Sequence, residues 1–156
     1  MTEGVARFVE RFAAVLIDGG VPRMPARAFG VLLASDDGRL TAAELAEALK
    51  VSPAAISGAV RYLVQTGLVE RVREPGSRRD VYRLGDDPWY EAIYRREPLI
   101  TRWQKALQDG IEAAGADTPA GARLKDSAEF FAFLQQELPA LLARWRESSR
   151  SSHLAP

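Results

Sequence analysis

The chain has 156 residues, with 21 basic and 21 acidic side chains, and 47% of its residues are hydrophobic. This length and composition allow a sizeable hydrophobic core and argue against wholesale disorder. There is no cysteine, which excludes disulfide bonds, thiol redox sensing and a cysteine-based zinc site. The single histidine, His153, lies in a serine-rich tail, so we expect neither a histidine-bound metal nor any other cofactor.

No segment approaches the roughly 18 consecutive apolar residues of a membrane span. Charged residues also interrupt the N-terminal segment, which argues against a signal peptide; they are Glu3, Arg7, Glu10, Arg11 and Asp18. We therefore expect a cytoplasmic protein with no membrane partner.

The first part of the chain predicts two helices and a short strand. Apolar residues recur at helical spacing from about 3 to 18, and Gly19–Gly20 ends this pattern. Pro25 suits the start of a second helix, whose apolar residues include Phe29. A turn at 35–38 precedes a short strand expected at Arg39–Leu40.

Two short capped helices come next. Thr41 and Glu44 form a capping box at the start of the third helix. Ser52 caps the fourth helix, whose first position is Pro53, where the missing N–H does no harm. Gly67 suits the position just after the end of this helix. Two helices joined by a tight turn predict a helix-turn-helix.

A basic β-hairpin is predicted after the two helices. Its strands are expected at about 69–73 and 81–84, joined by a turn at 75–77 that contains proline and glycine. This order of elements predicts a winged helix-turn-helix, which places one helix in the DNA major groove. Between residues 50 and 84, seven basic side chains stand against three acidic ones, so a chain of zero net charge has a locally basic region.

The rest of the chain predicts long helices. A helical region starts at Asp87–Pro88, and Pro98 is expected to divide or kink it, because proline inside a helix costs about 3 kcal/mol. A break at 115–121 precedes a final helix at about 122–147. Its apolar residues recur every seven positions, as at a helix–helix seam. They are Leu124, Phe131, Leu138 and Trp145 in one row, with Leu134 and Leu141 in another.

These elements predict a mainly α-helical protein, a winged helix-turn-helix with a small β-hairpin wing and N- and C-terminal dimerisation helices. We assign residues 22–85 to the DNA-binding domain. Residues 1–21 and 86–147 are assigned to a helical dimerisation region, and residues 148–156 to a disordered tail.

One face of the fourth helix has the predicted DNA contacts. At about 100° per residue, Ile56, Val60 and Leu63 fall on the side that packs on the domain. The opposite side begins with small residues, which let the backbone approach the base edges, and continues with Arg61, a donor to guanine or phosphate. A plain surface helix is the alternative. The predicted contacts are Ser52, Ala54, Ala55, Ser57, Gly58, Arg61 and Tyr62.

The hairpin supplies a second set of predicted contacts. Arg78 and Arg79 follow the turn residue Ser77, where a guanidinium can enter the electronegative minor groove or clamp its phosphates. Arg73 and Arg83, on the strands, are expected to contact phosphate or simply to cover the surface. A solvated run of charges is the alternative for all of these arginines.

Four aromatic residues leave two interpretations open. Trp89, Tyr90, Tyr94 and Trp103 would suit a site for a cation or an apolar small-molecule effector. Their helical spacing favours hydrophobic core or a dimer interface instead. Signals of catalysis are poor, because the chain has no phosphate-binding glycine loop and no nucleophile–base pair. We therefore expect that the protein is not an enzyme.

Taken together, these motifs resemble the MarR-type winged-helix regulators, and their GbsR-like branch most of all. The resemblance covers about residues 26–84 and rests on the segments LTAAELAEALKVSPAAIS, YLVQTGLVERV and GSRRDVYRL. It implies a homodimer on a pseudo-palindromic DNA site, with base readout by the helix Ser52–Tyr62 and wing contacts by Arg78 and Arg79. Ser77 departs from the acidic residue that many members have before the wing arginine.

The sequence therefore predicts a sequence-specific transcriptional regulator that binds double-stranded DNA as a homodimer. We expect a repressor that blocks polymerase and that a small-molecule effector releases from DNA. The alternative is a winged-helix module for protein–protein interaction without DNA binding. Such modules usually lack arginines at both the recognition helix and the wing.

Overall fold

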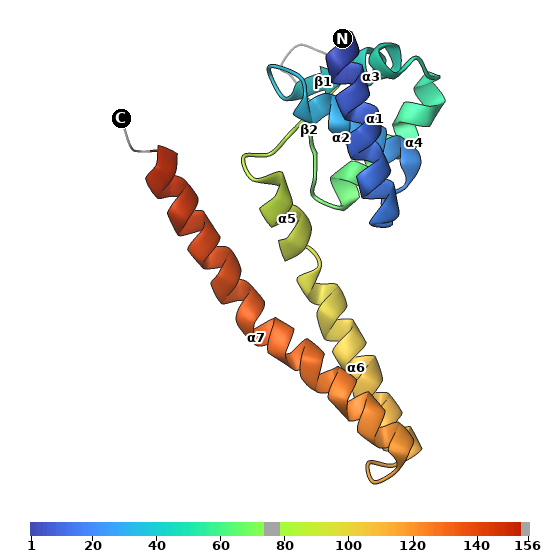
Figure 1. Ribbon diagram of the computed structural model, residues 1–156, viewed down its shortest axis with the longest axis vertical. Helices are drawn as coiled ribbons and strands as arrows, with labels where there is room; N and C mark the ends of the chain where they lie inside the picture. The colour runs from blue at the N-terminus through green and yellow to red at the C-terminus, as the bar shows by residue number, and fades with distance from the viewer. Residues whose placement is uncertain (74–78, 154–156) are drawn as a thin grey trace. The chain divides into compact units, whose positions relative to one another are not determined.

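The computed structural model describes residues 1–73 and 79–153, and the chain divides into two compact units, Met1–Ala92 and Ile93–Pro156 (Figure 1). Both units consist mainly of helices, and the first also contains a small sheet. Within the described ranges, no helix combines the length and the apolar character that crossing a membrane requires.

The first unit begins with four helices, α1 (Glu3–Asp18), α2 (Arg23–Leu33), α3 (Ala42–Leu49) and α4 (Pro53–Gln65). Their bounds follow the predicted ones closely, except that α2 starts two residues before the expected Pro25. The glycine pair after α1 ends that helix as expected, with Gly19 as its C-cap.

The helix-turn-helix is fixed by side-chain caps at both helix starts. Thr41 Oγ1 accepts a hydrogen bond from Glu44 N at 3.2 Å, and Glu44 Oε2 accepts one from Thr41 N at 2.7 Å. Ser52 Oγ accepts from Ala55 N at 3.3 Å. The turn between α3 and α4 passes through Lys50, which has a left-handed backbone with φ of 53°. The predicted capping box and the predicted cap of α4 are both confirmed.

The sheet has three antiparallel strands, β1 (Arg39–Thr41), β2 (Glu70–Arg73) and β3 (Asp80–Arg83), in the order β1-β3-β2. Val72 pairs with Val81 in the register of β2 and β3. Because successive side chains in a strand point to opposite faces, residues 71, 73, 80 and 82 share the face opposite to these valines. The turn expected at 75–77 lies outside the described residues.

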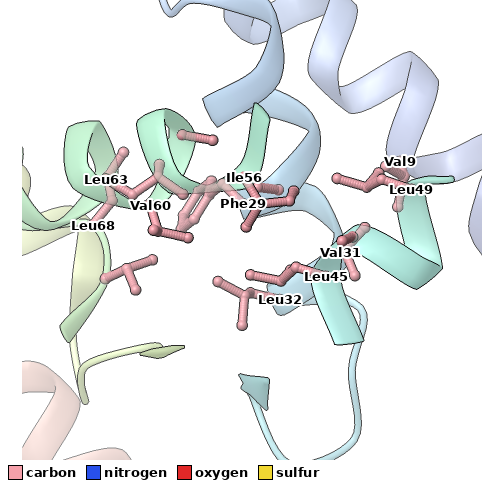
Figure 2. Close-up of a cluster of buried hydrophobic side chains, with 14 residues drawn as sticks. Val9, Phe29, Val31, Leu32, Leu45, Leu49, Ile56, Val60, Leu63 and Leu68 are labelled. Atoms are coloured by element: carbon pink, nitrogen blue, oxygen red, sulfur yellow. The ribbon is translucent and has the colours of Figure 1, made fainter. Parts of the chain in front are cut away.

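The hydrophobic core of the first unit lies where α2, α3 and α4 meet (Figure 2). Phe29, Leu32, Leu45, Ile56 and Leu63 are all 0% exposed. Burying one such side chain stabilises the fold by about 1.5–3 kcal/mol. Helix α1 joins this core through its own buried apolar face, so residues 1–21 lie in the same compact unit as the predicted DNA-binding domain, and their part in dimerisation stays a prediction.

Three further helices follow the sheet: α5 (Pro88–Tyr94), α6 (Glu97–Ala114) and α7 (Pro119–His153). Pro98 lies in the first turn of α6, so it separates two helices as predicted. The tail expected to be disordered from Ser148 is instead helical as far as His153. Ser148 Oγ donates to Trp145 O at 2.8 Å, a bond within the helix that satisfies the hydroxyl, and the polar sequence lacks a helix-breaking glycine or proline here.

The second unit is a hairpin of α6 and α7, which lie side by side (Figure 1). The rings of Trp103 and Phe131 meet edge to face with centroids 5.4 Å apart, and Gln135 Nε2 donates to Thr101 Oγ1 at 2.6 Å. The predicted seven-residue seam is therefore only partly an intrachain contact. Its row ends at Trp145, which is 55% exposed. A straight helix turns every 3.6 residues, so a strict seven-residue row drifts away from the neighbouring helix.

Candidate nucleic-acid interface

The two sides of α4 differ in exposure as the sequence predicted. Ile56, Val60 and Leu63 are 0%, 3% and 0% exposed and pack into the core. Five predicted DNA contacts are exposed on the other side, and Ala55 is half-buried, whereas Tyr62 is half-buried and packs against the core; the exposed ones are Ser52, Ala54, Ser57, Gly58 and Arg61. This placement leaves the backbone and the Arg61 guanidinium accessible to a groove of DNA.

Gly58 is the residue of α4 with the least side-chain bulk. A Cβ atom built on it would meet no heavy atom within 4 Å in the part of the chain that the structure describes. The absence of a side chain therefore serves no packing inside this unit. It does lower the profile of the helix, which allows a close approach of the backbone to a ligand surface.

The face of the β2–β3 hairpin that is opposite to Val72 and Val81 contains a cluster of charges. Arg71 Nη2 lies 2.6 Å from Asp80 Oδ2, and Arg73 Nε lies 3.6 Å from Asp80 Oδ1. The Arg71 hydrogen bond is the main cause that lowers the pKa of Asp80 below its usual value, and the charge of Arg73 adds to it. Asp80 is therefore ionised at neutral pH and holds two arginines at once.

The opposite face of the same hairpin has a second ion pair. Arg83 Nε donates to Glu70 Oε2 at 2.9 Å, and Arg83 Nη2 lies 2.8 Å from the same oxygen. Among the described residues of the hairpin, each face thus has one carboxylate. Both strand arginines that were expected to contact phosphate or cover the surface, Arg73 and Arg83, are engaged with a carboxylate.

A hollow of about 340 Å³ lies between α4 and the charged face of the hairpin. Polar side chains of the helix (Ser57, Arg61 and Gln65) and of the strands (Arg71, Asp80 and Tyr82) line it. Val60 and Val64 also line the hollow, so helix and hairpin share a mixed surface that contains two cations, Arg61 and Arg71, and the carboxylate of Asp80.

The predicted tip of the wing is described only in part. Arg79 is exposed at the start of β3, next to Asp80. Ser77 and Arg78, also predicted DNA contacts, lie outside the described residues. The charge of Arg79 contributes to the lowered pKa of Glu44, although the hydrogen bonds from Thr41 are the larger cause.

The four aromatic residues do not form one cluster in a single unit. In the first unit, the Trp89 ring meets the rings of Phe12 and Phe29 edge to face, with centroids 6.5 and 5.3 Å apart. Tyr90 lies in the same unit, whereas Tyr94 and Trp103 lie in the second. Both tryptophans are about half-exposed, at 46% and 48%. Trp89 and Trp103 therefore each pack on rings of their own unit, and the choice between effector site, core and interface stays a prediction.

Arg71 and Asp80 belong to the interface region but were not among the predicted contacts. The sequence showed their charges, but the diagonal contact depends on the register of β2 and β3, which pairs Arg71 with Tyr82 and Arg73 with Asp80. The alternation of valine with charged residues in both strands is the signal that places these side chains on one face. Among the described residues, no group of three or more acidic or histidine side chains is arranged to hold a metal ion.

Two family models match adjoining parts of the chain. A model described as MarR family matches residues 19–80, which include α2, α3, α4 and β2. A model described as an MmpR5-like MarR family transcriptional regulator matches residues 87–148, which include α5, α6 and most of α7.

Individual proteins show the same likeness. The HTH-type transcriptional regulator MmpR5 of Mycobacterium tuberculosis is 28% identical over 144 residues, which cover 92% of this chain and 87% of that protein. The HTH-type transcriptional repressor OpcR of Bacillus subtilis is 24% identical over 118 residues, which cover 69% of this chain and 63% of that protein.

A solved structure, described as the crystal structure of a transcriptional regulator, superposes with a TM-score of 0.84 at 28% identity. The match covers 92% of this chain and 99% of that one. The winged-helix fold agrees with both family matches, and over residues 19–80 and 87–148 the chain is similar to the DNA-binding transcriptional regulators of the MarR family.

Proposed function

We propose that the protein is a homodimeric repressor that binds a pseudo-palindromic operator through the exposed side of α4. The observation that supports this most directly is the composition of that side, which has small residues in its first turns and Arg61 after them; Ala54, Ser57, Gly58 and Arg61 are all exposed. A helix of this kind fits the major groove, where its N-terminal residues contact the base edges. In a dimer, two such helices enter major grooves about 34 Å apart.

Each predicted contact has a role that follows from its chemistry. Arg61 donates to guanine O6 and N7 or to a phosphate, and Ala54 or Ala55 meets a thymine methyl group. Ser52, Ser57 and Tyr62 donate to phosphates and fix the position of the helix on the duplex. Arg79 belongs to the wing that follows the adjacent minor groove, together with Ser77 and Arg78.

Dimerisation is proposed through the helices outside residues 22–85. The second unit exposes large apolar side chains on one side of α7, where Phe130, Phe133, Leu141 and Trp145 are each more than half-exposed. Spacings of three, eight and four residues place these four on one face of the helix. An apolar face of this size on one helix is typical of a protein–protein interface.

Repression follows from occupancy of the operator, since a dimer bound there blocks polymerase. The name of OpcR, a transcriptional repressor, supports this sign of regulation. The remaining step of the proposal is release by a small-molecule effector. The effector would favour a form of the dimer in which the spacing of the two α4 helices no longer fits DNA. The GbsR-like branch also stays a prediction, since the C-terminal family match is to MmpR5-like regulators.

The test is binding of the purified protein to the DNA upstream of its own gene, against random DNA of equal length, at two salt concentrations. We expect preference for the upstream DNA and a steep loss of affinity with salt. Arg61→Gln should lose that preference, whereas Arg11→Gln, an exposed charge on α1, should keep it. Equal weak binding to both DNAs by the wild type would contradict a specific operator in that region, and no binding at low salt would favour a protein-interaction module.

A further inference from the structure

We propose that Asp80 restrains non-specific DNA binding by holding Arg71, which lines the hollow between α4 and the β2–β3 hairpin, and the neighbouring Arg73 of the same hairpin face. A DNA phosphate that enters the hollow has to displace this carboxylate from the arginines. The inference rests on the proposed placement of α4 in the major groove. It gives a function to Asp80, whose charge is negative, whereas a side chain that contacts a DNA phosphate is usually positive.

The contacts of Asp80 engage both arginines of β2 on this face. The Arg71 side chain remains 53% exposed and the Arg73 side chain 69% exposed, whereas the Asp80 side chain is only 24% exposed. Asp80 Oδ1 finds no hydrogen-bond partner among the described residues and lies 3.6 Å from Arg73 Nε, beyond hydrogen-bond range. The carboxylate therefore lies beneath two guanidinium groups that reach toward solvent.

The position of the hollow places it where the phosphate backbone of bound DNA is expected to pass. If α4 lies in the major groove and the hairpin in the adjacent minor groove, the strand between the two grooves passes between helix and hairpin. Ser57 and Arg61 line the hollow from the helix, and Arg71 lines it from the hairpin. A phosphate there meets the cationic side chains of Arg61 and Arg71 together with the negative charge of Asp80.

The effect of Asp80 depends on the DNA sequence. On random DNA, affinity comes almost wholly from phosphate contacts, so a carboxylate that competes for two arginines lowers it directly. On the operator, base contacts from α4 add affinity that does not depend on these arginines. Asp80 therefore raises the ratio of specific to non-specific affinity, which suits a chain whose net charge is zero.

Asp80→Asn tests this proposal in the full-length protein. Fluorescence anisotropy with a random duplex and with the upstream duplex, over a series of salt concentrations, measures both affinities and both salt slopes. We expect roughly tenfold tighter binding to random DNA at low salt, and a slope of log affinity against log salt that is steeper by about 0.9 for each arginine released. The gain on the upstream duplex should be smaller, so the specificity ratio falls.

Glu70→Gln is the matched control. It removes one negative charge and one ion pair from the same hairpin, but on the opposite face and outside the hollow. We expect its affinity for random DNA to stay within about twofold of the wild type, because its charge does not compete for the hollow. The double variant Asp80→Asn/Arg71→Gln should lose most of the gain of Asp80→Asn, since the released guanidinium is absent.

The outcomes separate this proposal from the proposed function. Weaker binding of Asp80→Asn to both duplexes would overturn it, because the carboxylate would then position the arginines for DNA. An equal gain in Glu70→Gln would also overturn it, in favour of overall charge. Thermal unfolding of each variant checks the fold. Suppose that the wild type shows no preference for the upstream duplex and that Arg61→Gln binds both duplexes as tightly as the wild type. The operator proposal then fails, whatever the result for Asp80→Asn.

Discussion

Gly58 has an exposed position in the interior of α4 and no packing role in the described structure. We expect Gly58→Ala to raise the free energy of unfolding by about 0.5–1 kcal/mol, because glycine has the larger conformational entropy in the unfolded chain. Affinity for the operator should fall, since the added methyl group keeps the backbone away from the base edges. Urea unfolding and anisotropy measure the two effects. Unchanged operator affinity would show that the helix does not approach DNA at this residue.

Glu44 titrates as part of the capping box. The hydrogen bonds from Thr41 lower the pKa of its carboxyl, so the folded state binds protons less tightly than the unfolded chain. Its contribution to stability is therefore present above the unfolded pKa of about 4.3 and is lost as the pH falls through the lower folded pKa. Glu44→Gln should be less stable than the wild type at pH 7, by a difference that shrinks below pH 4. Urea unfolding across this pH range is the measurement, and a constant difference would contradict the assignment.

Lys50 sets the turn between α3 and α4. Its φ of 53° lies in the left-handed region, which costs a residue with a Cβ atom about 1 kcal/mol. Lys50→Gly should therefore stabilise the first unit, by at most about 1 kcal/mol, while Lys50→Ala keeps the strain and removes the charge. Comparing the two by thermal unfolding separates the backbone effect from the electrostatic one. Equal stability of the two variants would argue that the turn relaxes around the side chain.

The turn from α6 to α7 depends on Gly121. A Cβ atom built there would overlap the Gly115 carbonyl oxygen and lie 3.1 Å from Ala116 Cα, so the backbone of Gly115 and Ala116 would have to shift. We expect Gly121→Ala to lower the free energy of unfolding by about 1–3 kcal/mol, as overpacking does. Gly4→Ala, where the added Cβ meets no described atom within 4 Å, is the control and should be neutral or stabilising. A stability loss at Gly4 equal to that at Gly121 would contradict this explanation.

Local signals predicted the elements well because they act within a few residues. The capping box at Thr41, the cap at Ser52 and the division at Pro98 each depend on a helix end that the sequence itself specifies. The serine-rich segment after Glu147 was misjudged because composition does not tell a solvated helix from a disordered tail. The contact of Arg71 with Asp80 could not be predicted, since it requires the strand register that the hairpin turn sets.

At the level of the whole molecule, the exposed apolar face of α7 predicts where two chains meet in the proposed homodimer. We expect Phe133→Glu to turn the homodimer into a monomer, because a charge replaces a large apolar side chain that is 59% exposed in the single chain. Ala143→Glu, an exposed position about 80° around the helix from Phe133 and farther from the other three residues of this face, should stay dimeric. Light scattering after size-exclusion chromatography measures the mass. A dimeric Phe133→Glu would place the interface elsewhere.

The general plan of the molecule was predictable, but the role of its N-terminal helix was not. The amphipathic pattern of residues 3–18 specifies a helix with an apolar face but not the surface that covers it. In the structure Val9 and Ala13, each 1% exposed, use that face within the first unit. The proposed dimerisation region is accordingly concentrated in the second unit, where α7 still has an uncovered apolar side.

The separation of the two sides of α4 has a consequence for how such a regulator changes over evolution. One side is occupied by the core, whereas Ala54 and Arg61 on the other side are exposed. If α4 contacts bases as proposed, mutations at Ala54 or Arg61 would alter the preferred DNA sequence at little cost in folding. A duplicated copy of the gene would be free to drift toward a new operator while its product remained a stable protein throughout.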